Sequence, residues 1–119
     1  MATIMVVDDA MFIRMRCSKL LTEAGHDIIE ASNGAEALDK YKKARPDGVL
    51  LDITMPKMDG IVTLREIKRF DPDAQVAMVT AMGQRNMVIN ALKAGARDYI
   101  VKPFDGPRIL STVNKLISR

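Results

Sequence analysis

The stretch MVVDD, residues 5–9, passes directly from apolar residues to two adjacent carboxylates. Its apolar part has the continuous hydrophobicity of a strand that is covered on both faces of a sheet. Asp8 and Asp9 would repel each other at the end of this strand, so water or a cation must offset their charges. Which of the two it is depends on how the other strands of the chain end.

Apolar runs and amphipathic stretches alternate along the whole sequence. The apolar runs predict five strands, at residues 3–7, 27–31, 48–51, 75–79 and 98–101. Between them, hydrophobic residues recur at the spacing of one helix face. Five strand–helix units in series predict an α/β fold in which five helices cover a doubly wound parallel sheet.

Several residues predict where the helices begin and end. Asn33 followed by Glu36 is typical of a capping box at a helix start. Gly25 and Gly95 stand where helices should stop, and Pro107 suits a first helical turn.

Length and composition limit the class of protein. The 119 residues suffice for one domain, expected to cover residues 1–119, with a core that needs no disulfide. The single cysteine, Cys17, and the lack of a signal-like or membrane-spanning run predict a cytoplasmic protein that does not bind membranes. A net charge of +3 with no tryptophan and no long basic block argues against nucleic-acid binding.

The predicted strand ends carry a group of reactive side chains. Ligands bind parallel sheets beyond the carboxyl ends of the strands, where the strand order reverses. The residues at these ends are Asp8 and Asp9 after the first strand, Asp52 after the third, Thr80 after the fourth and Lys102 after the fifth. Three carboxylates, one hydroxyl and one ammonium are therefore expected on a single rim.

This set of side chains suits phosphoryl transfer. Neighbouring carboxylates raise one another's pKa, and a hard divalent cation such as Mg²⁺ removes that conflict. Lys102 and Thr80 could bind phosphoryl oxygens. Asp52, at the end of the central strand, is then the predicted nucleophile and would form an aspartyl phosphate. Each residue alone is more typical of a helix cap or a surface position, and the prediction depends on their occurrence together and in this order.

The same residues stand in longer motifs: VVDDA at 6–10, VLLDITMPKMDG at 49–60, VTAMG at 79–83 and DYIVKPF at 98–104. Over essentially its whole length the chain resembles the receiver domains of two-component response regulators. From TAMGQ to KPF it is most similar to the stand-alone chemotaxis regulators of that family. The resemblance implies a flavodoxin-like fold with strand order 2-1-3-4-5.

The resemblance also implies a metal site. Asp9, Asp52 and the backbone carbonyl of Thr54 would bind Mg²⁺, with Asp8 acting through water. Mn²⁺ or Ca²⁺ could substitute for Mg²⁺.

A phosphorylation cycle is implied as well. Asp52 would be the phosphoacceptor and would take its phosphoryl group from a CheA-type histidine kinase or a small phosphodonor. Lys102 would contact the phosphoryl oxygens, and the peptide bond before Pro103 would be cis. The protein would catalyse its own phosphorylation and dephosphorylation, but it would be a signalling switch and not an enzyme with outside substrates.

The resemblance also implies which residues change position on phosphorylation and so signal to a partner. Thr80 would move toward the phosphoryl group while Tyr99 turns inward. The expected partners are a flagellar switch protein and a phosphatase, and the chain is expected to be a monomer. Thr54 and Met82 occupy the two positions that tune the phosphate lifetime in the family.

Three alternatives remain open at this stage. The chain could be a receiver domain from a longer regulator with a DNA-binding or enzymatic output. A flavin-binding electron carrier has the same architecture, but Asp8 and Asp9 would repel the flavin phosphate. An aspartyl-phosphate phosphatase usually has a second acid two residues after the nucleophile, where this chain has Thr54.

Overall fold

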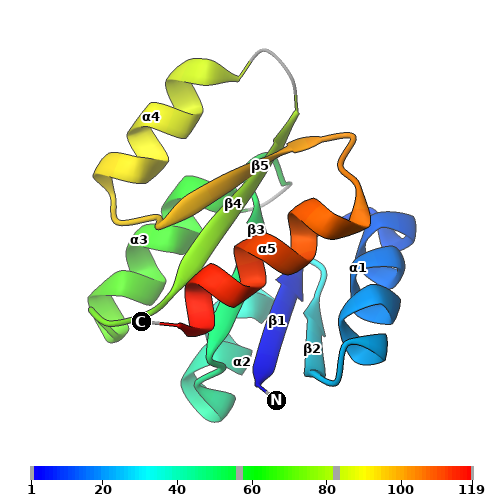
Figure 1. Ribbon diagram of the computed structural model, residues 1–119. Helices are drawn as coiled ribbons and strands as arrows, with labels where there is room; N and C mark the ends of the chain where they lie inside the picture. Colours follow the sequence, from blue (N-terminus) through cyan, green and yellow to red (C-terminus); the bar gives the residue numbers. More distant parts are fainter. Residues whose placement is uncertain (1, 56–57, 82–83, 119) are drawn as a thin grey trace.

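The computed structural model describes residues 2–55, 58–81 and 84–118. Strands and helices alternate through these residues (Figure 1). The strands are β1 (Thr3–Val7), β2 (Asp27–Ala31), β3 (Gly48–Asp52), β4 (Val76–Ala81) and β5 (Asp98–Lys102). The helices are α1 (Met11–Glu23), α2 (Gly34–Ala44), α3 (Gly60–Phe70), α4 (Arg85–Lys93) and α5 (Gly106–Ile117).

The strands form one parallel sheet with the order β2-β1-β3-β4-β5, which confirms the predicted fold class. After β2 the chain returns to the other side of β1, so the direction of strand addition reverses between β1 and β3. This reversal opens a crevice at the carboxyl ends of the two strands. The acidic end of MVVDD lies at this crevice.

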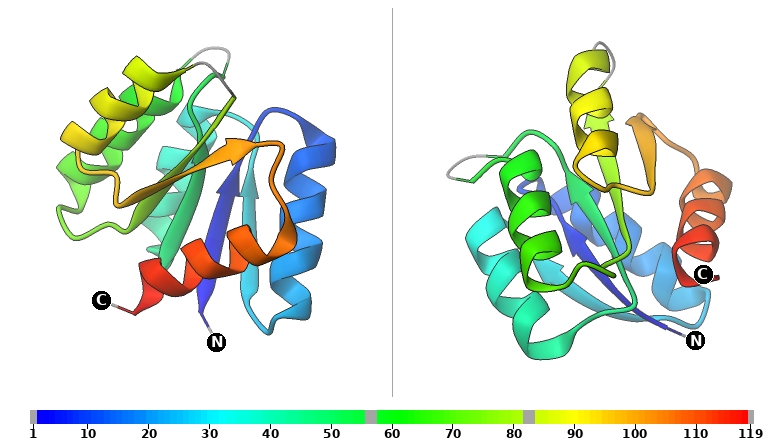
Figure 2. Two further views of the ribbon diagram at one scale, coloured as in Figure 1. Left: turned by 45° about the horizontal axis from the view of Figure 1, so that its top comes forward. Right: turned by 90° about the vertical axis from the view of Figure 1, so that its left-hand side faces the viewer.

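Both faces of the sheet are covered, as the apolar strands require. Helices α1 and α5 pack on one face, and α2, α3 and α4 pack on the other (Figure 2). Successive residues of β1 alternate between the two cores: Ile4 and Val6 face α1 and α5, while Met5 and Val7 face the other side. Within the described ranges, no helix combines the length and apolar character needed to cross a membrane.

Three strands extend further than the apolar runs predicted. β3 includes Asp52, and β4 and β5 continue to Ala81 and Lys102, whose residues pair with each other. Backbone pairing does not depend on whether a side chain is apolar, so a hydrophobic run underestimates the strand. As a result, Asp52, Thr80 and Lys102 are themselves strand residues and are held by the sheet.

The helix boundaries follow the predicted signals with one difference. The Asn33 side chain accepts a hydrogen bond from the Glu36 backbone N–H, but the Glu36 carboxylate accepts from the Ser32 N–H, one residue before the expected partner. Gly25 and Gly95 follow α1 and α4 with φ of 95° and 110°, a conformation that glycine adopts without strain. Pro107 is the second residue of α5.

Candidate functional site

Three carboxylates meet in the crevice between β1 and β3. Asp8, Asp9 and Asp52 each present a carboxylate oxygen within 4.8 Å of the others. Asp8 and Asp52 are almost fully buried, with 2% and 5% of their surface exposed, whereas Asp9 is exposed. The arrangement offers only oxygen ligands and is open to solvent on the side of Asp9, a donor set that suits a hard divalent cation.

Asp8 is held in place by groups of the protein itself. One carboxylate oxygen accepts a hydrogen bond from the Ala10 N–H at 2.9 Å, and the other accepts from the Lys102 ammonium at 3.0 Å. Its backbone carbonyl accepts from Arg14, which also pairs with Glu30. Asp8 therefore anchors the crevice, and Asp9 and Asp52 are the carboxylates with more capacity for a further ligand.

Asp52 lies in an environment that disfavours its charge. Burial, followed by the negative charges of Asp8 and Asp9, raises its pKa to about 6, although Lys102 and a backbone hydrogen bond from Thr54 act in the opposite direction. A cation bound beside Asp52 would favour the carboxylate form. That form is the one that a nucleophile at this position needs.

Lys102 reaches the crevice from the end of β5. Its ammonium lies 3.0 Å from Asp8 and 3.5 Å from Asp52. Burial acts to lower its pKa, but the hydrogen bond to Asp8 and the charge of Asp52 outweigh it, so the pKa of Lys102 is raised above its ordinary value. The ammonium is thus charged at neutral pH. The following peptide bond, to Pro103, is cis.

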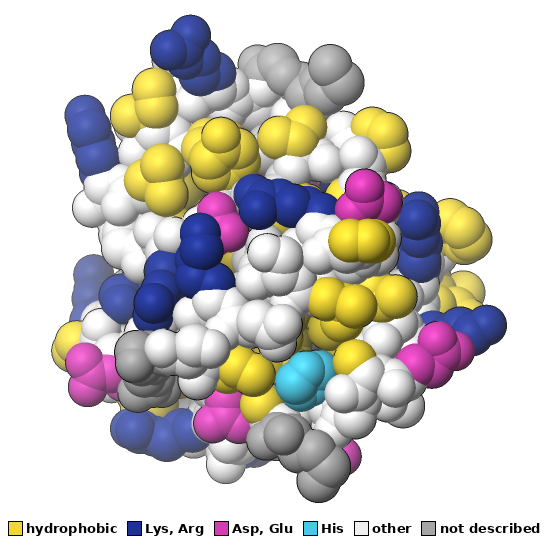
Figure 3. Space-filling view, viewed as in Figure 1, with side chains coloured by type: hydrophobic (Ala, Val, Ile, Leu, Met, Phe, Trp, Pro, Cys, Tyr) yellow, Lys and Arg dark blue, Asp and Glu magenta, His cyan; other side chains and the backbone are white. Residues whose placement is uncertain are grey.

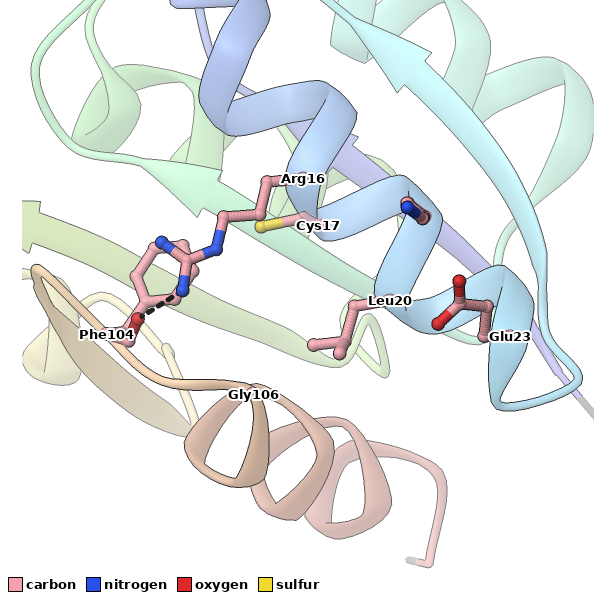
Figure 4. A pocket seen from close by; sticks show the side chains of 7 residues that line it. Arg16, Cys17, Leu20, Glu23, Phe104 and Gly106 are labelled. Atoms are coloured by element: carbon pink, nitrogen blue, oxygen red, sulfur yellow. Dashed lines mark hydrogen bonds between the residues drawn. The ribbon is translucent and has the colours of Figure 1, made fainter.

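A hollow of about 200 Å³ between α1 and α5 lies next to the segment that follows Lys102 (Figure 4). Arg16 on α1 donates a hydrogen bond to the Phe104 carbonyl at 3.3 Å, and its guanidinium lies 5.5 Å from the centre of the Phe104 ring. The contacts between Arg16 and Phe104 connect the segment after Lys102 to α1. Cys17 also lines the hollow, and burial and the charge of Asp8 raise the pKa of its thiol to about 11, so the thiol stays protonated.

Thr80 lies near the end of β4 and is buried. Its hydroxyl donates to the side-chain carbonyl of Gln84 at 2.8 Å. The side-chain N–H of Gln84 in turn donates to the Thr54 hydroxyl at 2.8 Å. Sequence reasoning did not assign Gln84 a role. Gln84 is the last residue of the TAMGQ stretch, but that stretch does not reveal the contact, which depends on how two loops that are 30 positions apart meet.

Tyr99 lies on β5 and 39% of its surface is exposed. It lines a hollow of about 470 Å³ between β5 and α4, together with Thr80, Gln84 and Val101. Figure 3 shows hydrophobic side chains gathered over this region, with Lys and Arg around them. The exposed apolar residues of α4 and β5 are Ile89, Leu92, Tyr99 and Val101. Met82 lies outside the described residues.

Taken together, the crevice has the groups that phosphoryl transfer to a carboxylate requires. It contains a buried carboxylate at the end of a strand, a cluster that can bind a divalent cation, and an ammonium next to both. Such sites act mainly by positioning the reactants and neutralising charge.

Comparison with known proteins gives a consistent result. The family model for the response regulator receiver domain matches residues 4–114. The chain is 51% identical to the chemotaxis protein CheY of Bacillus subtilis over 116 residues, which is 97% of each chain.

Solved structures agree with this match. The CheX–CheY–BeF₃–Mg²⁺ complex from Borrelia burgdorferi is matched with a TM-score of 0.92 and 40% identity, over 98% of this chain and 90% of that one. NtrX from Brucella abortus, in complex with ADP, is matched with a TM-score of 0.94 and 32% identity. That match covers 98% of this chain but spans only 27% of the NtrX chain.

Proposed function

The chain belongs to the family of response regulator receiver domains, and on this premise we propose that it is a phosphorylation-activated switch of chemotaxis. One observation carries the proposal: the carboxylates of Asp8, Asp9 and Asp52 gather within 4.8 Å, and the Lys102 ammonium lies 3.5 Å from Asp52. Residues 1–119 act as a single receiver domain in this proposal.

Asp9, Asp52 and the backbone carbonyl of Thr54 hold Mg²⁺, and Asp8 contributes through water. The raised pKa of Asp52 supports this assignment, because burial, and then the negative charge of Asp8, disfavours its carboxylate form, and a bound cation would offset both effects. When bound, Mg²⁺ neutralises negative charge on the phosphoryl oxygens. Mn²⁺ and Ca²⁺ are proposed to substitute, since both accept the same oxygen ligands.

Asp52 acts as the nucleophile. Its carboxylate oxygen forms a bond to the phosphorus of a phosphohistidine on a CheA-type kinase while the phosphorus–nitrogen bond breaks, and the leaving ring nitrogen takes up a proton from solvent, so that neutral imidazole is released. Lys102 binds the transferred phosphoryl oxygens, and the Thr80 hydroxyl donates to them. Water then attacks the phosphorus and loses a proton to solvent, the bond between phosphorus and the Asp52 oxygen breaks, inorganic phosphate leaves, and the carboxylate is restored.

Phosphorylation is read out on the surface formed by α4, β5 and α5. Tyr99 turns inward, which changes the shape of the exposed apolar surface that includes Ile89 and Leu92. A flagellar switch protein is the proposed output partner, because relatives named CheY are chemotaxis proteins. The CheX–CheY complex supports a CheX-type protein, acting as a phosphatase, as a second partner.

A peptide-binding experiment tests the output. The affinity for the amino-terminal peptide of a flagellar switch protein is measured with Mg²⁺ alone and with Mg²⁺ plus beryllofluoride, which stands in for the phosphoryl group on Asp52. The proposal predicts that affinity rises only with the mimic. If the mimic binds and the peptide does not, the receiver chemistry stands and the alternative output of a longer regulator is favoured.

A further inference from the structure

The side chain of Gln84 connects two other backbone segments at the rim of the crevice. Its side-chain oxygen accepts from the Thr80 hydroxyl at 2.8 Å and from the Ala81 N–H at 3.0 Å. Its side-chain nitrogen donates to the Thr54 hydroxyl at 2.8 Å. A single amide therefore links the end of β4 to the loop that follows Asp52.

The orientation of this amide is fixed by its partners. A backbone N–H can only donate, so the Gln84 atom that faces Ala81 must be the oxygen. The nitrogen then faces Thr54, whose hydroxyl accepts. All the side-chain contacts of Gln84 are mutually consistent in this orientation.

The hydrogen bond from Thr80 to Gln84 uses the hydroxyl hydrogen that the proposed phosphoryl site needs. A threonine hydroxyl has one hydrogen, and in this structure Thr80 directs it to Gln84 at 2.8 Å, with the Ala81 carbonyl as a longer second acceptor at 3.2 Å. To donate to a phosphoryl group on Asp52, Thr80 must give up its bond to Gln84.

We propose that Gln84 is a positioning residue that holds the Thr80 hydroxyl in the resting arrangement and thereby opposes binding of a phosphoryl group at Asp52. The inference rests on the proposed function. It adds a residue that shifts the equilibrium between the arrangement in which Thr80 donates to Gln84 and the one in which Thr80 donates to a phosphoryl group on Asp52. Breaking the Thr80–Gln84 bond is part of the cost of activation. The cost is limited, because a net hydrogen bond changes an equilibrium by a modest factor.

Gln84 also connects the position of the Thr80 hydroxyl to the output surface. Gln84 directly precedes α4, and its backbone carbonyl accepts from the Val88 N–H. Its side chain also lines the hollow between α4 and β5 with Tyr99. When the Gln84 amide is released from Thr80, the change occurs at the residue directly before α4, the helix that carries Ile89 and Leu92.

The test measures the dissociation constant of beryllofluoride in saturating Mg²⁺ by NMR titration. Gln84→Met keeps the length of the side chain and removes its hydrogen bonds. The matched control is Gln75→Met, the same change at the chain's other glutamine, which hydrogen-bonds Asp73 and Arg97 at the opposite end of β4. Both changes are repeated in a Thr80→Ala background, and Gln84→Ala serves as a second variant if Gln84→Met does not fold.

Gln84→Met is expected to bind beryllofluoride about three- to tenfold more tightly than the unmodified protein, and Gln75→Met is expected to bind it equally well. In the Thr80→Ala background, Gln84→Met should have no effect, because the hydroxyl that it releases is gone. An unchanged or weakened affinity for Gln84→Met would overturn the inference, as would a gain that persists without the Thr80 hydroxyl. If the unmodified protein itself fails to bind beryllofluoride, the proposed function fails and the inference falls with it.

Discussion

The ammonium of Lys102 lies 3.0 Å from a carboxylate oxygen of Asp8, closer than the 3.5 Å that separates it from Asp52. Lys102 is thus held at the crevice by Asp8. In the proposed function, this position lets Lys102 bind an incoming phosphoryl group without a large movement. Asp8 accordingly has a second role besides its part in the acidic cluster, which is to keep the ammonium in position.

The first prediction concerns this ammonium. Lys102→Met should slow phosphorylation by a small phosphodonor by about 10²- to 10³-fold, because a preorganised positive charge at the reacting phosphoryl group is lost. The rate is measured by intact mass over time in saturating Mg²⁺. Lys43→Met is the control, since Lys43 lies on α2 and pairs only with the exposed Asp39 in the described contacts. Equal rates for Lys102→Met and the unmodified protein would contradict the assignment.

The second prediction concerns the metal. Mg²⁺ at about ten times its dissociation constant should raise the free energy of unfolding by about 1.4 kcal/mol, because it binds the folded state. Asp9→Asn should remove most of this gain, because Asp9 is a proposed ligand of Mg²⁺ and is the carboxylate of the cluster that is exposed to solvent. Urea unfolding with and without Mg²⁺ measures both values. Asp39→Asn, a change of the same type on α2, should keep the full gain.

The third prediction follows from the raised pKa of Asp52. The folded protein holds a proton on this carboxyl up to about pH 6, whereas the unfolded chain releases it near 3.8. Between these values the folded state binds more protons, so this group makes the protein less stable as the pH rises. Without metal, Asp52→Asn should therefore stabilise the protein by up to about 3 kcal/mol at neutral pH.

This gain should shrink as the pH falls toward about 4, where the unmodified carboxyl is also neutral. The measurement is urea unfolding of both proteins in a chelator over this pH range. A gain that is independent of pH would show that the ionisation of Asp52 is not its cause.

The fourth prediction concerns Gly60, the first residue of α3. A Cβ at this position would overlap the backbone carbonyl of Asp52 and also lie 2.6 Å from the Ile53 Cα. Gly60→Ala should cost about 1–3 kcal/mol of stability and weaken Mg²⁺ binding, because Asp52 must shift. Calorimetry can measure both effects. Gly106→Ala is the control, since its Cβ would lie 3.2 Å from the movable end of Leu20 and should be tolerated.

Much of the fold and the crevice could be predicted from the sequence. Strands and their polar ends are local features, so Asp8, Asp52 and Lys102 could be found one by one and brought together by the rule that parallel strands share a carboxyl edge. The strand order itself came from the family resemblance. Hydrophobic runs predict strands but do not determine which strands lie side by side.

Other features could not be predicted because they depend on side-chain contacts between distant segments. The Thr80–Gln84–Thr54 network requires two loops to meet at hydrogen-bond distance. The pairing of Lys102 with Asp8 in preference to Asp52 likewise depends on differences of half an ångström or so, which are set by packing. Neither leaves a pattern in the sequence.

Intact-mass measurement of the protein after incubation with acetyl phosphate and Mg²⁺ tests whether Asp52 is the phosphoacceptor. The unmodified protein should gain the mass of one phosphoryl group, in a linkage that hydroxylamine cleaves, as expected of an acyl phosphate. Asp52→Asn should gain none, and the unmodified protein in a chelator should gain none either. Labelling of Asp52→Asn to the same extent as the unmodified protein would contradict the claim that Asp52 is the phosphoacceptor.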